Sequence, residues 1–110
     1  MKDLTISDYK AVLYYYNIEI DTLSKKQIIT QAEYILANKL CRCIKKINSQ
    51  KKNEVRSIAI CKNSIFKKKG LTLSKFKCKK NPMLLPFNKS KKNLKKIKRK
   101  LTLRKYKKSI

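Results

Sequence analysis

The chain has 110 residues, of which 31 are lysine or arginine, six are acidic and none is histidine. This length suits one small domain with a tail, and the net charge of +25 indicates an anionic partner. No apolar run is long enough for a transmembrane helix, and residues 1–10 resemble neither a signal peptide nor a transit peptide, so we expect an intracellular protein.

The positive charge is unevenly distributed along the chain. Residues 1–40 contain five lysines and five acids and are neutral, whereas residues 41–110 contain the remaining 26 basic residues and one acid, Glu54. This difference indicates that the first part folds or meets a protein while the second part meets a polyanion. Nucleic acid is the polyanion that the composition favours.

The first predicted element is an amphipathic helix over residues 7–17. Ser7 can cap its N-terminus, Asp8 suits the positive end of the helix dipole, and Asn17 is a suitable stop. Residues 18–23 follow as an extended connection. This connection leads directly into a second helix.

Residues 25–40 give the stronger helix prediction. Ser24 and Gln27 have the S-x-x-Q spacing of a capping box, in which each side chain bonds the other residue's backbone N–H. Apolar side chains then recur at helical spacing from Ile28 to Leu40, without glycine or proline. We expect this helix to pack on the first as a hairpin.

The stretch TISDYKAVLYYYNIEIDTLSKKQIITQAEYIL, residues 5–36, resembles the SAP-type helix–extended loop–helix DNA-binding modules. The resemblance implies that Lys25 and Lys26 contact phosphates, helped by the free backbone N–H groups at the helix N-terminus. The alternative is a plain helical hairpin used only for packing. The sequence leaves both interpretations open.

Residues 41–80 are expected to form a small basic module with two short strands and one or two helical turns. SIAIC at residues 57–61 and SKFKC at residues 74–78 have the composition of strands. Residues 63–70 between them are predicted to be helical and to end at Gly70, the only glycine of the chain. The NPMLLP stretch that follows is expected to break regular structure at its two prolines.

The four cysteines have the spacing C-x-C-x17-C-x16-C. Two end the second predicted helix and the other two each end a predicted strand, so neighbouring strands would gather four thiolates, one of the ligand sets of a tetrahedral zinc site. Basic neighbours would lower the thiol pKa values. The predicted ligands are Cys41, Cys43, Cys61 and Cys78, flanked by Arg42, Lys45, Lys62, Lys77 and Lys79. We therefore predict a structural zinc ion as cofactor.

The C-x-C pair leaves two alternatives to zinc. On a continuous helix Cys41 and Cys43 would point about 200° apart, so a shared ion requires the helix to end near Leu40. The cysteines could instead be buried free thiols. They could also form disulfides, as in a virion-type protein.

Residues 81–110 form a lysine-rich tail that is expected to stay open, or to form a helix on contact, because its charges repel one another. Phe76, Phe87 and Tyr106 are available to stack on bases. Only four arginines are present, so we expect phosphate contacts largely without base reading. The residues predicted to bind nucleic acid, duplex DNA above all, are Lys25, Lys26, Arg42, Lys45, Lys67, Lys68, Lys69, Lys91, Lys92, Lys95, Lys96, Lys98, Arg99, Lys100, Arg104 and Lys105.

Three stretches together carry a family resemblance: ILANKLCRCIKKI, SIAICKNSIFKKKGLTLSKFKCKK and the basic LTLRK end. They resemble small lysine-rich, four-cysteine proteins of the nucleocytoplasmic large DNA viruses, the giant viruses. The resemblance implies a setting in the virion, the viral factory or the host nucleus, and it implies no particular activity.

These observations predict a small α+β protein: a helix–extended loop–helix over residues 1–40, the cysteine module over residues 41–80 and the tail over residues 81–110. The lack of histidine and the scarcity of carboxylates argue against an enzyme. We expect a non-catalytic nucleic-acid-binding accessory protein of a large DNA virus, active in DNA compaction or transcription. The alternative is a minor capsid or scaffold protein whose basic tail lies along acidic protein or the inner membrane.

Overall fold

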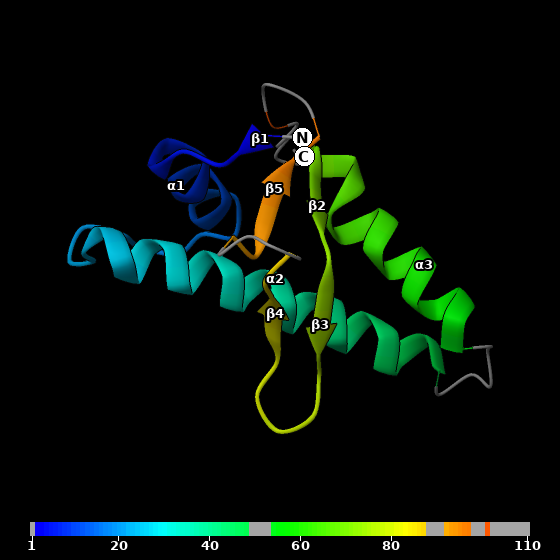
Figure 1. The fold of residues 1–110 in the computed structure, drawn as a ribbon. Helices are drawn as coiled ribbons and strands as arrows, with labels where there is room; N and C mark the ends of the chain where they lie inside the picture. Colours follow the sequence, from blue (N-terminus) through cyan, green and yellow to red (C-terminus); the bar gives the residue numbers. More distant parts are fainter. Residues whose placement is uncertain (1, 49–53, 88–91, 98–100, 102–110) are drawn as a thin grey trace, which may run out of the picture.

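The structure of the protein is a computed structural model that describes residues 2–48, 54–87, 92–97 and 101 (Figure 1). In chain order the described elements are β1 (Lys2–Asp3), α1 (Ile6–Tyr15), α2 (Lys25–Asn48), α3 (Glu54–Ile65), the 3-10 turn η1 (Lys67–Lys69), β2 (Leu71–Leu73), β3 (Lys75–Lys77), β4 (Met83–Leu85) and β5 (Leu94–Lys96). Three helices with two small antiparallel sheets confirm the predicted α+β class.

Local hydrogen bonds fix both ends of α1. The N-cap is Thr5 rather than the predicted Ser7, because Thr5 and Asp8 form a reciprocal capping box. The Asp8 N–H donates to the Thr5 hydroxyl at 3.2 Å, and the Thr5 N–H donates to the Asp8 carboxylate at 2.9 Å. The predicted stop is confirmed: Asn17 follows the helix with a φ of 61°, in the left-handed region.

The N-terminus of α2 follows the sequence prediction, whereas its C-terminus does not. The Ser24 N–H donates to Gln27 Oε1 at 2.9 Å and the Gln27 N–H donates to Ser24 Oγ at 3.2 Å, so the capping box is confirmed. The predicted end near Leu40 is wrong, because the buried stripe that begins at Ile28 continues at four-residue spacing to Ile44. Continued burial on one face keeps the chain helical through both cysteines.

The predicted strand at residues 57–61 is also wrong, since these residues lie in α3. Ser57 and Cys61 are fully buried one helical turn apart, while Ile60 between them is exposed. A short apolar run alone cannot distinguish a strand from a helix segment, and here the spacing of the buried residues is helical. After η1, Gly70 adopts a φ of 83° and ends the helical segment as predicted.

The three-stranded sheet joins segments that are far apart in the sequence (Figure 1). Its order is β1-β5-β2, and β5 pairs antiparallel with both neighbours. Residues 1–40, 41–80 and 81–110 each contribute one strand to it. Part of the predicted open tail is therefore the central strand, with Leu94 fully buried.

The second sheet is a hairpin of β3 and β4, which confirms the predicted strand at residues 74–78. Phe76 lies opposite Leu84 in the antiparallel register. Pro82 and Pro86, which were predicted to break regular structure, flank β4, where their missing N–H groups cost no ladder hydrogen bond. The hairpin crosses α2 and projects beyond it (Figure 1).

One apolar core connects all these elements. Its largest fully buried side chains include Leu13 of α1, Leu36 of α2, Phe66 before η1, Leu71 of β2 and Leu94 of β5. The helices α1 and α2 pack on each other, as the hairpin prediction required. The basic elements described below are therefore anchored to a shared interior.

Candidate nucleic-acid interface

The four cysteines form two disulfides, Cys41–Cys78 and Cys43–Cys61. The first joins α2 to the residue after β3, and the second joins α2 to α3. Because α2 stays helical, the two cysteines that are two residues apart project about 200° apart around its axis. They therefore reach different neighbours.

The predicted zinc site is wrong for this reason. All four proposed ligands are bonded in sulfur–sulfur pairs, which also excludes the alternative of free thiols. Within the described ranges, no group of three or more His, Cys, Asp or Glu side chains could hold a metal ion. The zinc prediction required a helix break near Leu40 that would bring all four sulfurs to one point, and α2 does not break there.

The disulfides hold the basic elements in fixed positions on α2. Their partners are separated by 37 and 18 residues, so each bridge contributes roughly 3–4 kcal/mol in the chain-entropy account. One bridge fastens the β3–β4 hairpin and the other fastens α3. The backbone positions that carry the cations are therefore held close to one another.

Lys69, a predicted nucleic-acid contact, has a structural role instead. It is only 7% exposed, and its Nζ donates to the Ile65 carbonyl at 3.0 Å. The same Nζ lies 5.0 Å from the ring centroid of Tyr15 and 5.7 Å from that of Tyr16. Burial lowers the pKa of Lys69. Lys69 thus joins the α3–η1 region to the C-terminus of α1.

Lys96 is likewise part of the interior. It is 7% exposed, and its Nζ lies 2.7 Å from Asp8 Oδ2, so it links β5 to the first turn of α1. Burial opposes the charge of the Asp8 carboxylate, but hydrogen bonds from Lys96 and Thr5 outweigh it and lower the pKa of Asp8. Neither Lys69 nor Lys96 is placed to contact a phosphate.

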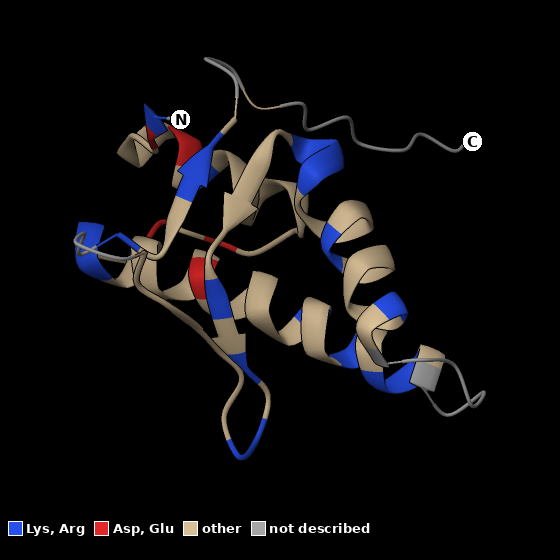
Figure 2. Cartoon of the chain, turned by 45° about the vertical axis from the view of Figure 1, so that its right-hand side comes forward, with Lys and Arg blue, Asp and Glu red and all other residues tan. Residues whose placement is uncertain are grey.

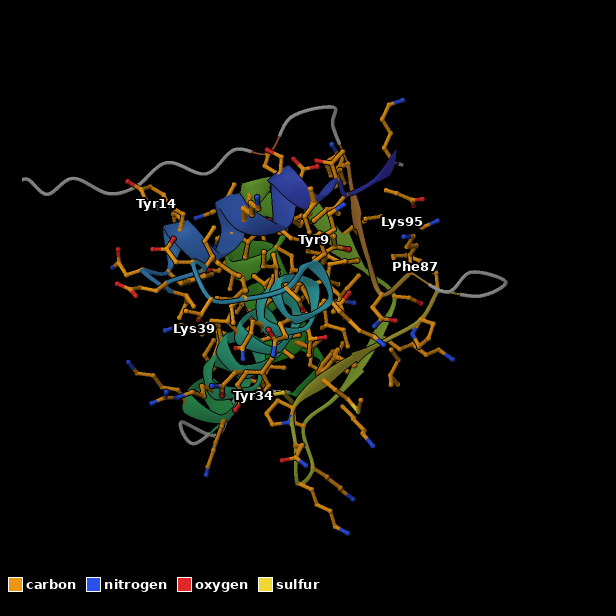
Figure 3. All side chains as sticks on the ribbon, turned by 90° about the vertical axis from the view of Figure 1, so that its left-hand side faces the viewer. Tyr9, Tyr14, Tyr34, Lys39, Phe87 and Lys95 are labelled. Atoms are coloured by element: carbon orange, nitrogen blue, oxygen red, sulfur yellow. A yellow bond between two sulfur atoms is a disulfide. The ribbon has the colours of Figure 1, made fainter. Side chains whose placement is uncertain are left out.

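The remaining predicted contacts are distributed over several surfaces. Lys95 is half-buried, with its Nζ 5.1 Å from the Phe87 ring centroid (Figure 3). The exposed positions are Lys25 and Lys26 at the start of α2, Arg42 and Lys45 in its second half, Lys67 and Lys68 on η1, and Lys92 before β5. Lys91, Lys98, Arg99, Lys100, Arg104 and Lys105 lie outside the described residues.

Arg42 and Lys45 border a groove of about 940 Å³ between α2 and the β3–β4 hairpin. The residues of α2 that line this groove lie on one face of the helix: Asn38, Cys41, Arg42, Ile44 and Lys45. The lining residues from other parts of the chain are Ile58, Phe76, Lys77, Cys78, Lys79 and Pro82. The groove thus combines apolar side chains and a disulfide with four cationic groups.

A second groove of about 640 Å³ adjoins the first. From α2 it is lined by Thr30, Glu33 and Tyr34, from the hairpin by Lys77, Lys79, Lys80, Asn81, Pro82, Met83 and Leu84, and it also includes Asn93. Lys77, Lys79 and Pro82 line both grooves. We call the combined surface, which runs from Thr30 to Lys45 on α2 and over residues 76–84, the α2–hairpin channel.

The channel carries a surplus of positive charge. Figure 2 shows basic residues on the hairpin and in the second half of α2. Glu33 is the single carboxylate among the channel's lining residues. Burial raises the pKa of Glu33, and the hydrogen bond that Asn93 Nδ2 donates to its Oε1 at 2.9 Å partly offsets this. The channel therefore attracts anions.

Sequence reasoning missed several residues of this surface. Lys77 and Lys79 were considered only as neighbours of the thiols, and Lys80 was not considered. The sequence did indicate a basic surface here, because four of the six residues from 75 to 80 are lysines, and Cys78 lies among them. Tyr34, which is 47% exposed beside the hairpin (Figure 3), has no such signal in the sequence.

Among the described helices, none has the length and apolar character needed to cross a membrane. Comparison with family models, with curated proteins and with solved structures finds no match for this chain. A functional assignment therefore rests on the chemistry of the α2–hairpin channel.

Proposed function

We propose that this protein is a non-catalytic accessory protein that binds nucleic acid through phosphate contacts, with the α2–hairpin channel as its main site. One observation carries the proposal: Arg42, Lys45, Lys77 and Lys79 border one groove on two elements that a disulfide joins. Cations held together on a rigid surface attract a polyanion without paying the entropy of ordering a flexible chain.

The composition of the channel favours binding without sequence reading. Four of its five lining cations are lysines, which act as point charges on phosphates, whereas bidentate base recognition relies on arginine and side-chain amides. Duplex DNA of random sequence is therefore a suitable first ligand. Roles in DNA compaction or transcription are consistent with such binding.

The disulfides bear on where the protein acts. Disulfides persist in oxidising settings, which include virions, and they are rare in cytosolic and nuclear proteins. Together with the resemblance to lysine-rich proteins of giant viruses, the two bridges favour the virion over the host nucleus. We propose packaged viral DNA as the polyanion.

The disulfides also favour a second candidate function. A small cross-linked protein with exposed cations suits a minor capsid or scaffold component that lies along acidic protein or the inner membrane surface. In that case the charges would contact fixed carboxylates or lipid phosphates. Binding to free DNA would then be weak.

The salt dependence of binding to random duplex DNA tests the first proposal. For each phosphate contact, the logarithm of affinity falls with the logarithm of salt concentration by about 0.9. Replacing Arg42, Lys45, Lys77 and Lys79 with alanine should therefore reduce the slope by about 3–4. The matched control replaces Lys25, Lys26, Lys67 and Lys68 with alanine, which removes the same charge elsewhere and should change the slope less.

A truncation completes the test. Removing residues 102–110 deletes four basic residues and leaves β5 intact, whereas removal of residues 89–110 would also delete the central strand of the sheet. Equal slopes for all three variants would show that total charge, rather than the channel, drives binding. A flat slope for the unaltered protein would contradict nucleic-acid binding and favour the structural role.

A further inference from the structure

We infer that the α2–hairpin channel takes unpaired bases of single-stranded nucleic acid, which stack on Tyr34 and Phe76 while the surrounding cations hold the phosphates. This inference rests on the proposed function, binding of nucleic acid through phosphate contacts, and it names single strands rather than a duplex as the ligand that the channel prefers. The evidence for it is the aromatic and apolar lining of the channel, because phosphate binding requires only cations and hydrogen-bond donors.

Each of the two adjoining grooves contains one aromatic ring. Tyr34 lines one and Phe76 lines the other, and Lys77 and Lys79 border both. Tyr34 is 47% exposed, so its ring can be reached from solvent, whereas Phe76 packs against the apolar core and is only partly exposed. Aromatic side chains along a basic groove are the arrangement that proteins use for single strands, since every base has a π-face.

The apolar floor favours the same ligand. The Cys41–Cys78 disulfide and Ile58 line the first groove, and Met83 and Leu84 line the second. In a duplex the base faces are stacked inside and the surface presents charged phosphates, which gain nothing from an apolar floor. Unpaired bases can bury one face there while their phosphates remain at the cationic rim.

A short stretch of chain can reach both grooves. The grooves share Lys77, Lys79 and Pro82 of the hairpin, which crosses α2, so a strand that occupies both grooves passes over the hairpin. Twelve stacked nucleotides extend about 40 Å at about 3.4 Å each. An oligonucleotide of twelve nucleotides is therefore a sufficient probe.

The decisive probe is a pair of oligonucleotides of about 12 units: a thymidine oligonucleotide and an abasic strand that carries the same phosphates without bases. Stacking of one base on an aromatic side chain contributes about 1–3 kcal/mol, which corresponds to about five- to 150-fold in affinity. The thymidine strand should bind at least about fivefold more tightly than the abasic strand. A 12-base-pair duplex and anionic phosphatidylserine vesicles complete the set of ligands.

Tyr34→Leu should weaken binding of the thymidine strand by at least about fivefold and change binding of the abasic strand by less than about twofold. The matched control is Tyr14→Leu, because Tyr14 is 76% exposed on α1, away from the hairpin (Figure 3). It should change neither affinity. Phe76→Leu serves as a second variant once thermal unfolding shows that it folds.

Two results would overturn the inference and leave the proposed function standing: equal affinity for the thymidine and abasic strands, or an equal loss on both strands in Tyr34→Leu. In either case phosphate binding persists and base stacking does not occur. Binding to anionic vesicles without binding to any oligonucleotide would overturn both the inference and the proposed function.

Discussion

Residues 2–40 and the disulfide-linked residues 41–97 are held together by different forces. The first region is neutral, and its helices begin and end at capping boxes and at a left-handed residue. The second region contains 19 basic residues and one acid, so it carries +18 of the chain's net charge of +25, and two disulfides and two small sheets fix its short elements. Both regions share the apolar core; the first adds local hydrogen bonds to it, and the second adds covalent cross-links.

The second region needs cross-links because its charges repel one another. Compact packing of many lysines costs free energy, which a small apolar core cannot offset alone. The disulfides reduce the entropy of the unfolded chain and so compensate part of this cost. The same bridges hold the cations of the channel together.

Reduction of both disulfides should lower the free energy of unfolding more than any other change described here. The free energy of unfolding should fall by about 3–4 kcal/mol per bridge, a large part of the roughly 5–15 kcal/mol of a typical domain. Urea unfolding with and without a dithiol measures the loss. Amide hydrogen exchange should show that α3 and the hairpin lose protection before α1.

An unchanged unfolding free energy after complete reduction would mean that packing alone holds the second region. A thiol titration on the unfolded protein provides the control, because it shows whether all four sulfurs were reduced. Uniform loss of protection over α1 and the hairpin would remove the difference between the two regions and make the fold a single cooperative unit.

The next largest loss of unfolding free energy is expected for buried leucines, one from each region. Leu36 in α2 and Leu94 in β5 are both fully buried, so replacing either with alanine should cost about 2–5 kcal/mol in unfolding free energy. Ile97→Ala is the control, because Ile97 is adjacent to β5 but 45% exposed, and it should cost less than about 1 kcal/mol. A small effect for Leu94→Ala would show that β5 is not part of the shared core.

The smallest expected effect concerns the ion pair that joins the two regions. Asp8→Asn should lower the unfolding free energy by about 1–3 kcal/mol, because it removes the negative charge that lies 2.7 Å from the ammonium group of the buried Lys96. The pKa of Asp8 is lowered in the folded state, so its stabilisation is present above the ordinary aspartate pKa and is lost as pH falls through the folded value.

Urea unfolding between neutral and acidic pH measures this dependence. The unaltered protein should lose stability as pH falls below about 4, and Asp8→Asn should lose less over the same range. Asp21→Asn is the matched control, since Asp21 is an exposed acid in the loop before α2. Parallel pH curves for the unaltered protein and Asp8→Asn would contradict a stabilising role for the ion pair.

The candidate site could be predicted only in part. Arg42 and Lys45 were identified from charge alone, and they border the channel. Lys69 and Lys96 have the same charge but are buried, because strand pairing and packing place them inside. The charge of a lysine can be read from the sequence, but whether its side chain is exposed or buried cannot.

By itself the sequence determined the start of α2, the stops at Asn17 and Gly70, the charge asymmetry and the α+β class. Each of these depends on residues within three or four positions of one another, or on composition. Only the tertiary structure decided the cysteine partners, the strand β5 and the α2–hairpin channel. These depend on the direction in which a side chain leaves a helix and on pairings between residues far apart in the chain, such as Asn93 with Glu33, which no local pattern encodes.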